Sequence, residues 1–284
     1  MKLKTYKTKE AFCKDNLKLL EKEEALNNIM IAVILDAKEE EVENWLLARV
    51  ENDSKIEMII IINKPKNGLL MYSPTKNYSD EISEFIASEI NKLDIDLLEI
   101  NSRKQLCENV AKYYTKLNGK KIKSKKDKYI LELTKLEEIP INEKLELVKI
   151  ENENCIEEIC DNIKEFQEEA HKKVITNDEA REHANIHMKK GLYVFKNDKG
   201  EIVLQAMTSR KLINGYVIGA VVTPKKYRGK GYGKIGMYLL SNKLLNDGAK
   251  VLALYTDAKN EISNHVYEKV GYKRISEELL ISFE

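Results

Sequence analysis

The segment Val221–Gly236, which reads VVTPKKYRGKGYGKIG, limits what this chain can fold into more than any other stretch. A β-branched run enters a turn at Pro224, and a loop with three closely spaced glycines then opens onto an apolar-periodic helix. Consecutive backbone N–H groups at a helix N-terminus bind anions, and Arg228, Lys230 and Lys234 add positive charge around the loop. The segment therefore predicts a site for a ligand that carries a pyrophosphate.

Two well-known phosphate-binding patterns do not fit this loop. Ile235 stands where the P-loop pattern requires a Ser or Thr hydroxyl for magnesium. The dinucleotide pattern Gly-x-Gly-x-x-Gly can be placed on Gly231, Gly233 and Gly236, with Asp257 after the next strand-like run as its acidic partner. The loop lies so late in the chain, however, that the second half of a dinucleotide-binding fold has no room to follow it.

A third pattern fits residue by residue. The run Arg228–Gly233, RGKGYG, resembles the acetyl-CoA pyrophosphate loop, Arg/Gln-x-x-Gly-x-Gly/Ala, of the GNAT superfamily of N-acetyltransferases. The resemblance continues through a helix with apolar residues at 235, 239, 240 and 244, a capping glycine at 248 and a strand at 251–256. The family's next motif, Asn-x-x-Ser/Ala-x-x-x-Tyr-x-x-x-Gly-Phe/Tyr, falls on Asn260, Ser263, Tyr267, Gly271 and Tyr272. Motifs in this order are far more specific than a lone glycine-rich loop.

The resemblance implies an α/β (α+β) fold with two tandem GNAT-like domains, each a mixed β-sheet flanked by helices. We expect a degenerate first domain at 1–138 and a catalytic, acetyl-CoA-binding domain at 139–284, joined near Pro140. The run Gly68–Pro74 parallels Gly219–Pro224, but neither Gly nor Arg follows it, so this loop cannot wrap a pyrophosphate. An unrelated α+β first domain that matches by chance is the alternative.

Apolar periodicity and turn residues predict the individual elements. Helices are expected at 8–36, 79–92, 103–117, 153–170 and 177–190, with a strand at 31–34 as the alternative for the end of the first. Strands are expected at 45–50, 56–63, 68–73, 96–101, 128–134, 145–150, 191–197, 201–209 and 215–223. Alternating units of this kind are typical of a mixed sheet with helices packed on it.

Composition and charge argue against several classes of protein. Lys and Arg number 48 against 47 Asp and Glu, so no net field attracts nucleic acid or an anionic membrane. The longest apolar runs, 29–35 and 58–62, are too short to span a bilayer, and residues 1–7 lack a signal-like apolar core. Four scattered cysteines, at 13, 107, 155 and 160, fit a reducing cytoplasm, and the basic run 120–126 is expected to be a solvated loop. We therefore expect a cytoplasmic monomer or homodimer.

The resemblance implies an N-acetyltransferase that uses acetyl-CoA as co-substrate and acetylates a primary amine of a small molecule, such as a metabolite, an amino sugar or an antibiotic-like amine. Tyr267 matches the family tyrosine that protonates the departing CoA thiolate. The alternatives are a protein that senses acetyl-CoA without turnover, and an enzyme that acetylates a peptide or protein amine. The implied cofactor contacts are Val221, Val222 and Thr223 for the pantetheine arm, and Arg228, Gly229, Lys230, Gly231, Tyr232, Gly233, Lys234, Asn260 and Ser263 for the remainder.

The sequence does not identify the general base. His183 and His187 lie four residues apart on a predicted helix, but no third ligand accompanies them, so no metal site is expected. Other polar residues fall in segments that line the substrate in the family, and none stands out as the base. These residues are Glu168, Glu169, His171 and Gln205.

Overall fold

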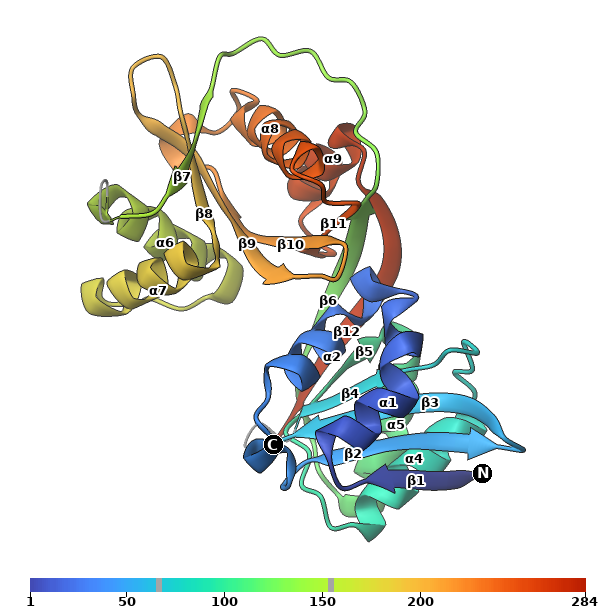
Figure 1. The fold of residues 1–284 in the computed structure, drawn as a ribbon. Helices are drawn as coiled ribbons and strands as arrows, with labels where there is room; N and C mark the ends of the chain where they lie inside the picture. Colours follow the sequence, from blue (N-terminus) through green and yellow to red (C-terminus); the bar gives the residue numbers. More distant parts are fainter. Residues whose placement is uncertain (65–67, 153–155) are drawn as a thin grey trace. The chain divides into compact units, whose positions relative to one another are not determined.

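The computed structural model describes residues 1–64, 68–152 and 156–284. The chain forms two compact units, and Figure 1 labels their helices and strands. The first unit contains Met1–Ile130, Asp257–Lys259 and Ile275–Glu284. The second contains Leu131–Thr256 and Asn260–Arg274.

The elements follow the chain in two similar series. The first series consists of β1 (Lys2–Tyr6), α1 (Lys9–Glu21), α2 (Glu24–Asp36), α3 (Glu39–Val42), β2 (Leu46–Asn52), β3 (Lys55–Asn63), β4 (Gly68–Tyr72), α4 (Asp80–Lys92), β5 (Glu99–Arg103), α5 (Lys104–Asn118) and β6 (Ile122–Leu133). The second consists of β7 (Glu146–Ile150), α6 (Ile156–His171), α7 (Asn177–Lys190), β8 (Leu192–Lys196), β9 (Ile202–Lys211), β10 (Gly215–Val222), η1 (Lys225–Tyr227), α8 (Tyr232–Asn246), β11 (Val251–Asp257), α9 (Glu261–Val270) and β12 (Lys273–Phe283).

Both series are built in the same order. Apart from the short helices α3 and η1, each has a strand, two helices, three strands, and then helix, strand, helix and strand. The strands β1 to β4 pair antiparallel and β4 pairs parallel with β5, just as β7 to β10 pair antiparallel and β10 pairs parallel with β11. The chain is therefore a tandem repeat of one mixed α/β fold, and the alternative of an unrelated first domain is wrong.

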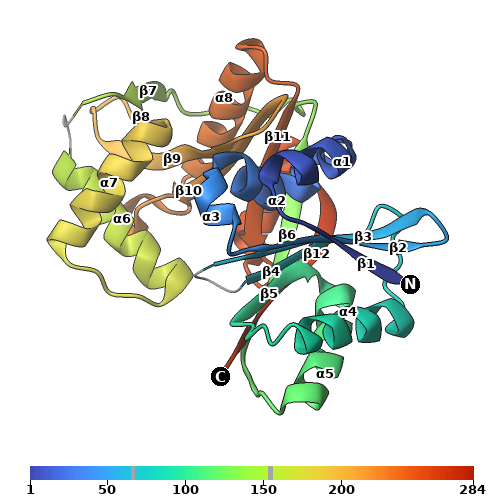
Figure 2. The same ribbon diagram turned by 60° about the horizontal axis from the view of Figure 1, so that its bottom comes forward.

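The central strand of the first unit, β3, is buried on both faces, which explains its unbroken apolar run. Ile59 and Ile61 pack with α1 and α2, whereas Met58, Ile60 and Ile62 pack with α4 and α5. Figure 2 shows the two helix pairs on opposite faces of these strands. Two separate apolar cores therefore hold the first unit together.

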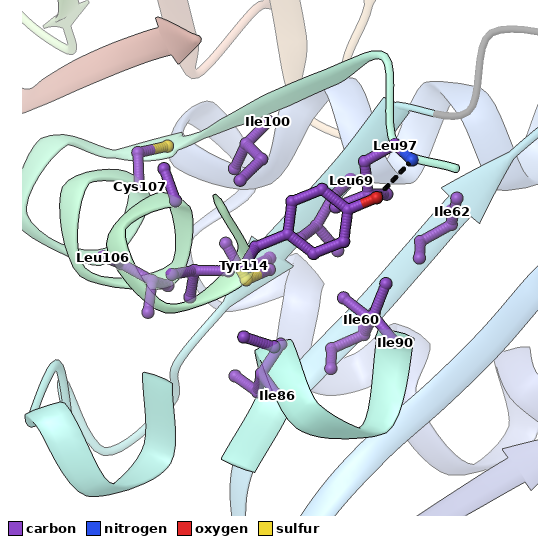
Figure 3. Packing of buried hydrophobic residues seen from close by; sticks show 14 of the residues in the cluster. Ile60, Ile62, Leu69, Ile86, Ile90, Leu97, Ile100, Leu106, Cys107 and Tyr114 are labelled. Carbon is purple, nitrogen blue, oxygen red and sulfur yellow. Dashed lines mark hydrogen bonds between the residues drawn. The ribbon is translucent and has the colours of Figure 1, made fainter. Parts of the chain in front are cut away.

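Tyr114 of α5 lies in the core beneath α4 and α5 (Figure 3). Its hydroxyl accepts a hydrogen bond from the Leu97 N–H and donates one to the Ile95 carbonyl, both at 2.9 Å. A buried tyrosine loses stability if its hydroxyl has no partner, and here the segment before β5 supplies both partners. The same contacts fix the entry of the chain into β5.

In the second unit, α6 and α7 pack on one face of the sheet through a cluster that includes Ile159, Ile163 and Val194. On the other face α8 approaches the strands closely at Gly236. A Cβ at this glycine would lie 2.2 Å from Leu204 Cδ2. Gly236 is therefore needed for α8 to pack closely on the sheet.

Most predicted elements are present, and the differences are few. Residues 8–36 form two helices, and 31–34 is helical rather than a strand because Ile31 and Ile34 share the buried face of α2. The basic run 120–126 is not only a loop, since β6 already begins at Ile122. Strands β1 and β12 were not predicted. The start of the predicted helix 153–170 lies partly outside the described residues, and α6 begins at Ile156.

The two compact units do not coincide with the expected domains of 1–138 and 139–284, because the first unit ends its main segment at Ile130 and also contains 257–259 and 275–284. Within the first unit, β12 pairs antiparallel with β5, and Ile281 lies opposite Ile100. Whether 1–138 and 139–284 fold separately stays a prediction. In the described part of the chain, no helix is both long and apolar enough to cross a membrane. Of the predicted free cysteines, Cys13, Cys107 and Cys160 are free thiols, and Cys155 lies outside the described residues.

Candidate functional site

The central strands of the second unit separate where the candidate site begins. β10 pairs with β11 only from Gly215 to Ile218, and its register with β9 shifts between Gly219 and Val222. Ala220 in this bulge has a φ of 47°, which is rare for a residue with a side chain. The backbone of 221–223 on the β11 side is therefore not paired with a strand, and an extended ligand has room to add there.

The glycine-rich loop presents backbone donors at the start of α8. Gly229 and Gly231 have φ values of 78° and 81°, and the Cβ that either would carry meets no atom within 4 Å. No described residue accepts a hydrogen bond from the N–H groups of 229–234. α8 has no side-chain cap and no acidic residue in its first turn. Its N-terminus is therefore an uncompensated anion site.

Arg228 does not contribute the free positive charge that the sequence led us to expect. Its Nη2 donates to Glu165 at 2.5 Å and to Glu169 at 2.8 Å, and its Nε donates to the Thr223 carbonyl at 2.8 Å. This guanidinium lowers the pKa of Glu169 below its usual value. Arg228 thus fixes the loop to α6 and to the end of β10, and its charge is largely neutralised in this structure.

The lysines and the tyrosine of the loop have different surroundings. Lys230 Nζ lies 5.8 Å from the centre of the Tyr227 ring, close enough for a cation–π contact. Lys234 has no ion-pair partner among the described residues. Tyr232 is buried against Tyr227, with ring centres 6.4 Å apart, so only its backbone is available to a ligand. The positive charge left for a phosphate comes from the lysines and the helix N-terminus.

The second motif forms the helix α9. Asn260 is its N-cap, and the side-chain oxygen accepts a hydrogen bond from the Ser263 N–H at 3.1 Å. Tyr267 is buried, and its hydroxyl has no hydrogen-bond partner in the described structure. Burial raises the pKa of Tyr267 to about 12, so the phenol stays protonated at neutral pH. Tyr272 is a core residue whose hydroxyl lies 2.9 Å from Ser241 Oγ.

The candidate bases remain unassigned. His187 is buried, and burial together with the nearby His183 lowers its pKa to about 4, so it is neutral at pH 7. Gln205 is fully buried in β9, accepts a long 3.4 Å hydrogen bond from the Asn162 amide, and leaves its own Nε2 without a partner. His171 packs against Phe166. No group of three metal-ligating side chains was found among the residues that the structure describes.

Sequence reasoning missed three features of this site. No residue type in the sequence around Ala220 indicates the bulge there. The two carboxylates that hold Arg228 are signalled, because Glu165 and Glu169 stand four apart on an amphipathic helix and so share one face. The pairing of Asn162 with Gln205 joins residues that are 43 positions apart, and only the tertiary fold brings them together.

Comparisons with known proteins agree with this geometry. Residues 156–272 match the family model described as the acetyltransferase (GNAT) family. No curated protein matches the chain. An acetyltransferase of the GNAT family from Colwellia psychrerythraea is 11% identical over 100% of both chains, with a TM-score of 0.58. A Drosophila protein is 10% identical over 99% of this chain and 98% of its own, with a TM-score of 0.63. A GCN5-related N-acetyltransferase from Sphaerobacter thermophilus is 14% identical over 93% and 90%, with a TM-score of 0.54.

At these identities the solved structures show a shared fold alone. The mixed sheet with separated central strands and an anion-binding helix N-terminus defines the class of GNAT-fold proteins. The match to the acetyltransferase (GNAT) family model lies at residues 156–272, which is less than half of the chain.

Proposed function

We propose that the second unit is an N-acetyltransferase that moves an acetyl group from acetyl-CoA to a primary amine of a small molecule, such as a metabolite, an amino sugar or an antibiotic-like amine. The observation that carries the proposal is the continuous run of unpaired backbone donors at 229–234, next to the open edge of β10. The run suits a pyrophosphate, and the open edge at 221–223 suits the pantetheine arm.

In this proposal the amine nitrogen attacks the thioester carbonyl, and the carbon–sulfur bond then breaks. A backbone N–H at the Ala220 bulge stabilises the oxyanion. Tyr267 donates its proton to the departing thiolate, while the proton of the amine leaves to a base that the structure does not single out. Asn260 and Ser263 stand at the start of α9 and would contact the cofactor from there.

The first unit lacks these features, and we propose that it does not bind CoA. Its counterpart of α8 is α4, whose first turn carries Asp80 and Glu81 and is capped by the Ser79 hydroxyl. Negative charge at a helix N-terminus disfavours an anion there. The counterpart of α9 is α5, and each of these helices ends at a glycine. Four residues before that glycine, α9 has Tyr267 and α5 has Thr115. Both the phosphate site and the proposed acid are therefore missing.

One observation favours a second function, a protein that holds acetyl-CoA without turnover. A phenol with a pKa of about 12 is a weaker acid than a free tyrosine, which ionises near 10. Bound cofactor would have to bring the thiolate against the hydroxyl for transfer to proceed.

The test is thiol release from acetyl-CoA with a panel of primary amines, together with calorimetric titration of CoA. The enzyme hypothesis expects at least one amine to raise the rate at least tenfold above hydrolysis, and expects the Tyr267→Phe variant to lose that increase. Binding of CoA with no turnover for any amine would support the sensor. Absence of CoA binding would overturn both.

A further inference from the structure

The first unit contains a pocket of about 440 Å3 at the carboxyl ends of β4 and β5. The two strands pair only as far as Leu70 and Asn101. A 2.7 Å hydrogen bond from Ser102 Oγ to the Met71 carbonyl marks the point where they separate. The pocket opens just beyond this point. Its place in the fold matches the opening between β10 and β11 in the second unit, but different residues line it.

One acidic side chain at this pocket has no cation beside it. The Glu23 carboxylate accepts a hydrogen bond from the buried Tyr72 hydroxyl at 2.7 Å. No lysine, arginine or histidine among the described residues lies within ion-pair distance of Glu23. Burial and the Glu23 charge raise the pKa of Tyr72 above its usual value, so the hydroxyl remains a donor and holds the carboxylate in place. A half-buried carboxylate held in this way attracts a cation.

One basic side chain at the same pocket also lacks a partner. Lys76 follows β4 in a turn, has a φ of 55°, and makes no ion pair with a described residue. The other two cations at the pocket are already neutralised, because Arg103 pairs with the buried Glu278 at 2.8 Å and Lys104 pairs with Asp127 at 2.8 Å. Lys76 is therefore the cation that a ligand would meet unpaired in this part of the structure.

We propose that this pocket binds a small zwitterion of the α-amino-acid type, whose ammonium contacts Glu23 and whose carboxylate contacts Lys76. Both charges line one pocket, yet they do not pair with each other. A simple anion would be repelled by Glu23 and a simple cation by Lys76, whereas a molecule with both charges satisfies the two side chains together. Tyr72 and Tyr78 supply aromatic wall for a side chain. The volume lies in the range of small-molecule sites.

The proposal concerns the unit without the glycine-rich loop and does not depend on acetyl transfer. Its test is calorimetric titration of the full chain, without acetyl-CoA, with the twenty proteinogenic α-amino acids. At least one should bind saturably at millimolar concentration or below. Its N-acetyl derivative, which lacks the ammonium, and its carboxamide, which lacks the carboxylate, should each bind at least about tenfold more weakly.

Two variants locate the site. Glu23→Gln keeps an oxygen for the Tyr72 hydroxyl but removes the charge, and Lys76→Gln alters an exposed side chain whose loss does not affect folding. Each should weaken binding about tenfold or more. The matched controls Glu10→Gln and Lys14→Gln, exposed on α1 away from the pocket, should leave it unchanged. The proposal is wrong if no amino acid binds, if either derivative binds as tightly as its parent, or if both pocket variants bind like the wild type.

Discussion

Gly233→Ala should raise stability and preserve cofactor binding, whereas Gly233→Val should lose cofactor binding. Gly233 lies in the first turn of α8 with an ordinary φ, and a Cβ there would meet only Thr223 Oγ1, at an acceptable 3.4 Å. Replacing glycine by alanine in a helix stabilises it by about 0.5–1 kcal/mol, with the smaller figure applying near a terminus. We therefore expect the free energy of unfolding to rise by roughly 0.5 kcal/mol in urea titrations.

The same methyl group projects beside Thr223, where the proposed pantetheine and pyrophosphate run. The loop pattern allows Ala at this position, so Gly233→Ala should keep CoA affinity within about threefold of the wild type. Gly233→Val adds two further methyl groups beside Thr223 and should lower CoA affinity, measured by calorimetry, at least about tenfold, which is roughly 1.4 kcal/mol. Gly236→Ala is the matched comparison, because its Cβ would collide with Leu204 and should destabilise the domain directly. A folded Gly233→Val variant that binds CoA as the wild type does would refute the loop assignment, and Gly233→Ala is the control that shows the position tolerates a single methyl group.

Three further changes test the site. Tyr267→Phe should lower kcat by roughly 10²–10⁴-fold and leave the acetyl-CoA dissociation constant within about threefold of the wild-type value. A wild-type rate in single-turnover experiments would show that Tyr267 is not the acid. Glu169→Gln should raise CoA affinity severalfold, more so at low salt, because it removes one of the two carboxylate charges that neutralise the Arg228 guanidinium. Unchanged affinity would mean that this guanidinium does not reach the phosphates. Burial lowers the pKa of His187 to about 4, against 6.5 in the unfolded chain. The free energy of unfolding should therefore fall by up to about 3 kcal/mol as the pH drops from 6.5 toward 4. Urea titrations of His187→Leu should lack this loss, and an equal loss in the variant would contradict the prediction.

The sequence predicted the second unit well because its signals are local. Gly229 and Gly231 of the loop meet a local demand, since both have a left-handed φ. The helix α9 begins after Asn260, the first residue of the second motif, whose side chain caps it. Propensity, periodicity and capping all act within a few residues, so they can be read without knowing the fold.

What could not be predicted depends on residues distant in sequence. Arg228 is neutralised by carboxylates some sixty positions earlier in the chain. β12 has alternating exposure and weak periodicity, and its partner β5 lies about 180 residues away. The expected positive field around the loop was therefore overstated, since a count of charges in one segment ignores the counter-charges that folding brings to it.

The two units share one fold but differ in the few residues on which the proposed cofactor site depends. Both have a helix that follows the fourth antiparallel strand, and both have parallel central strands that separate. In the first unit Asp80 and Glu81 occupy the first turn of that helix, where each acidic residue interacts with the helix dipole by about 0.3–1 kcal/mol. Their charge, together with the Ser79 cap, is enough to shift anion affinity by one to two orders of magnitude, about 1.4 kcal/mol for each. Side chains such as Tyr72 and Arg103 instead line a polar pocket beyond the separating strands of the first unit.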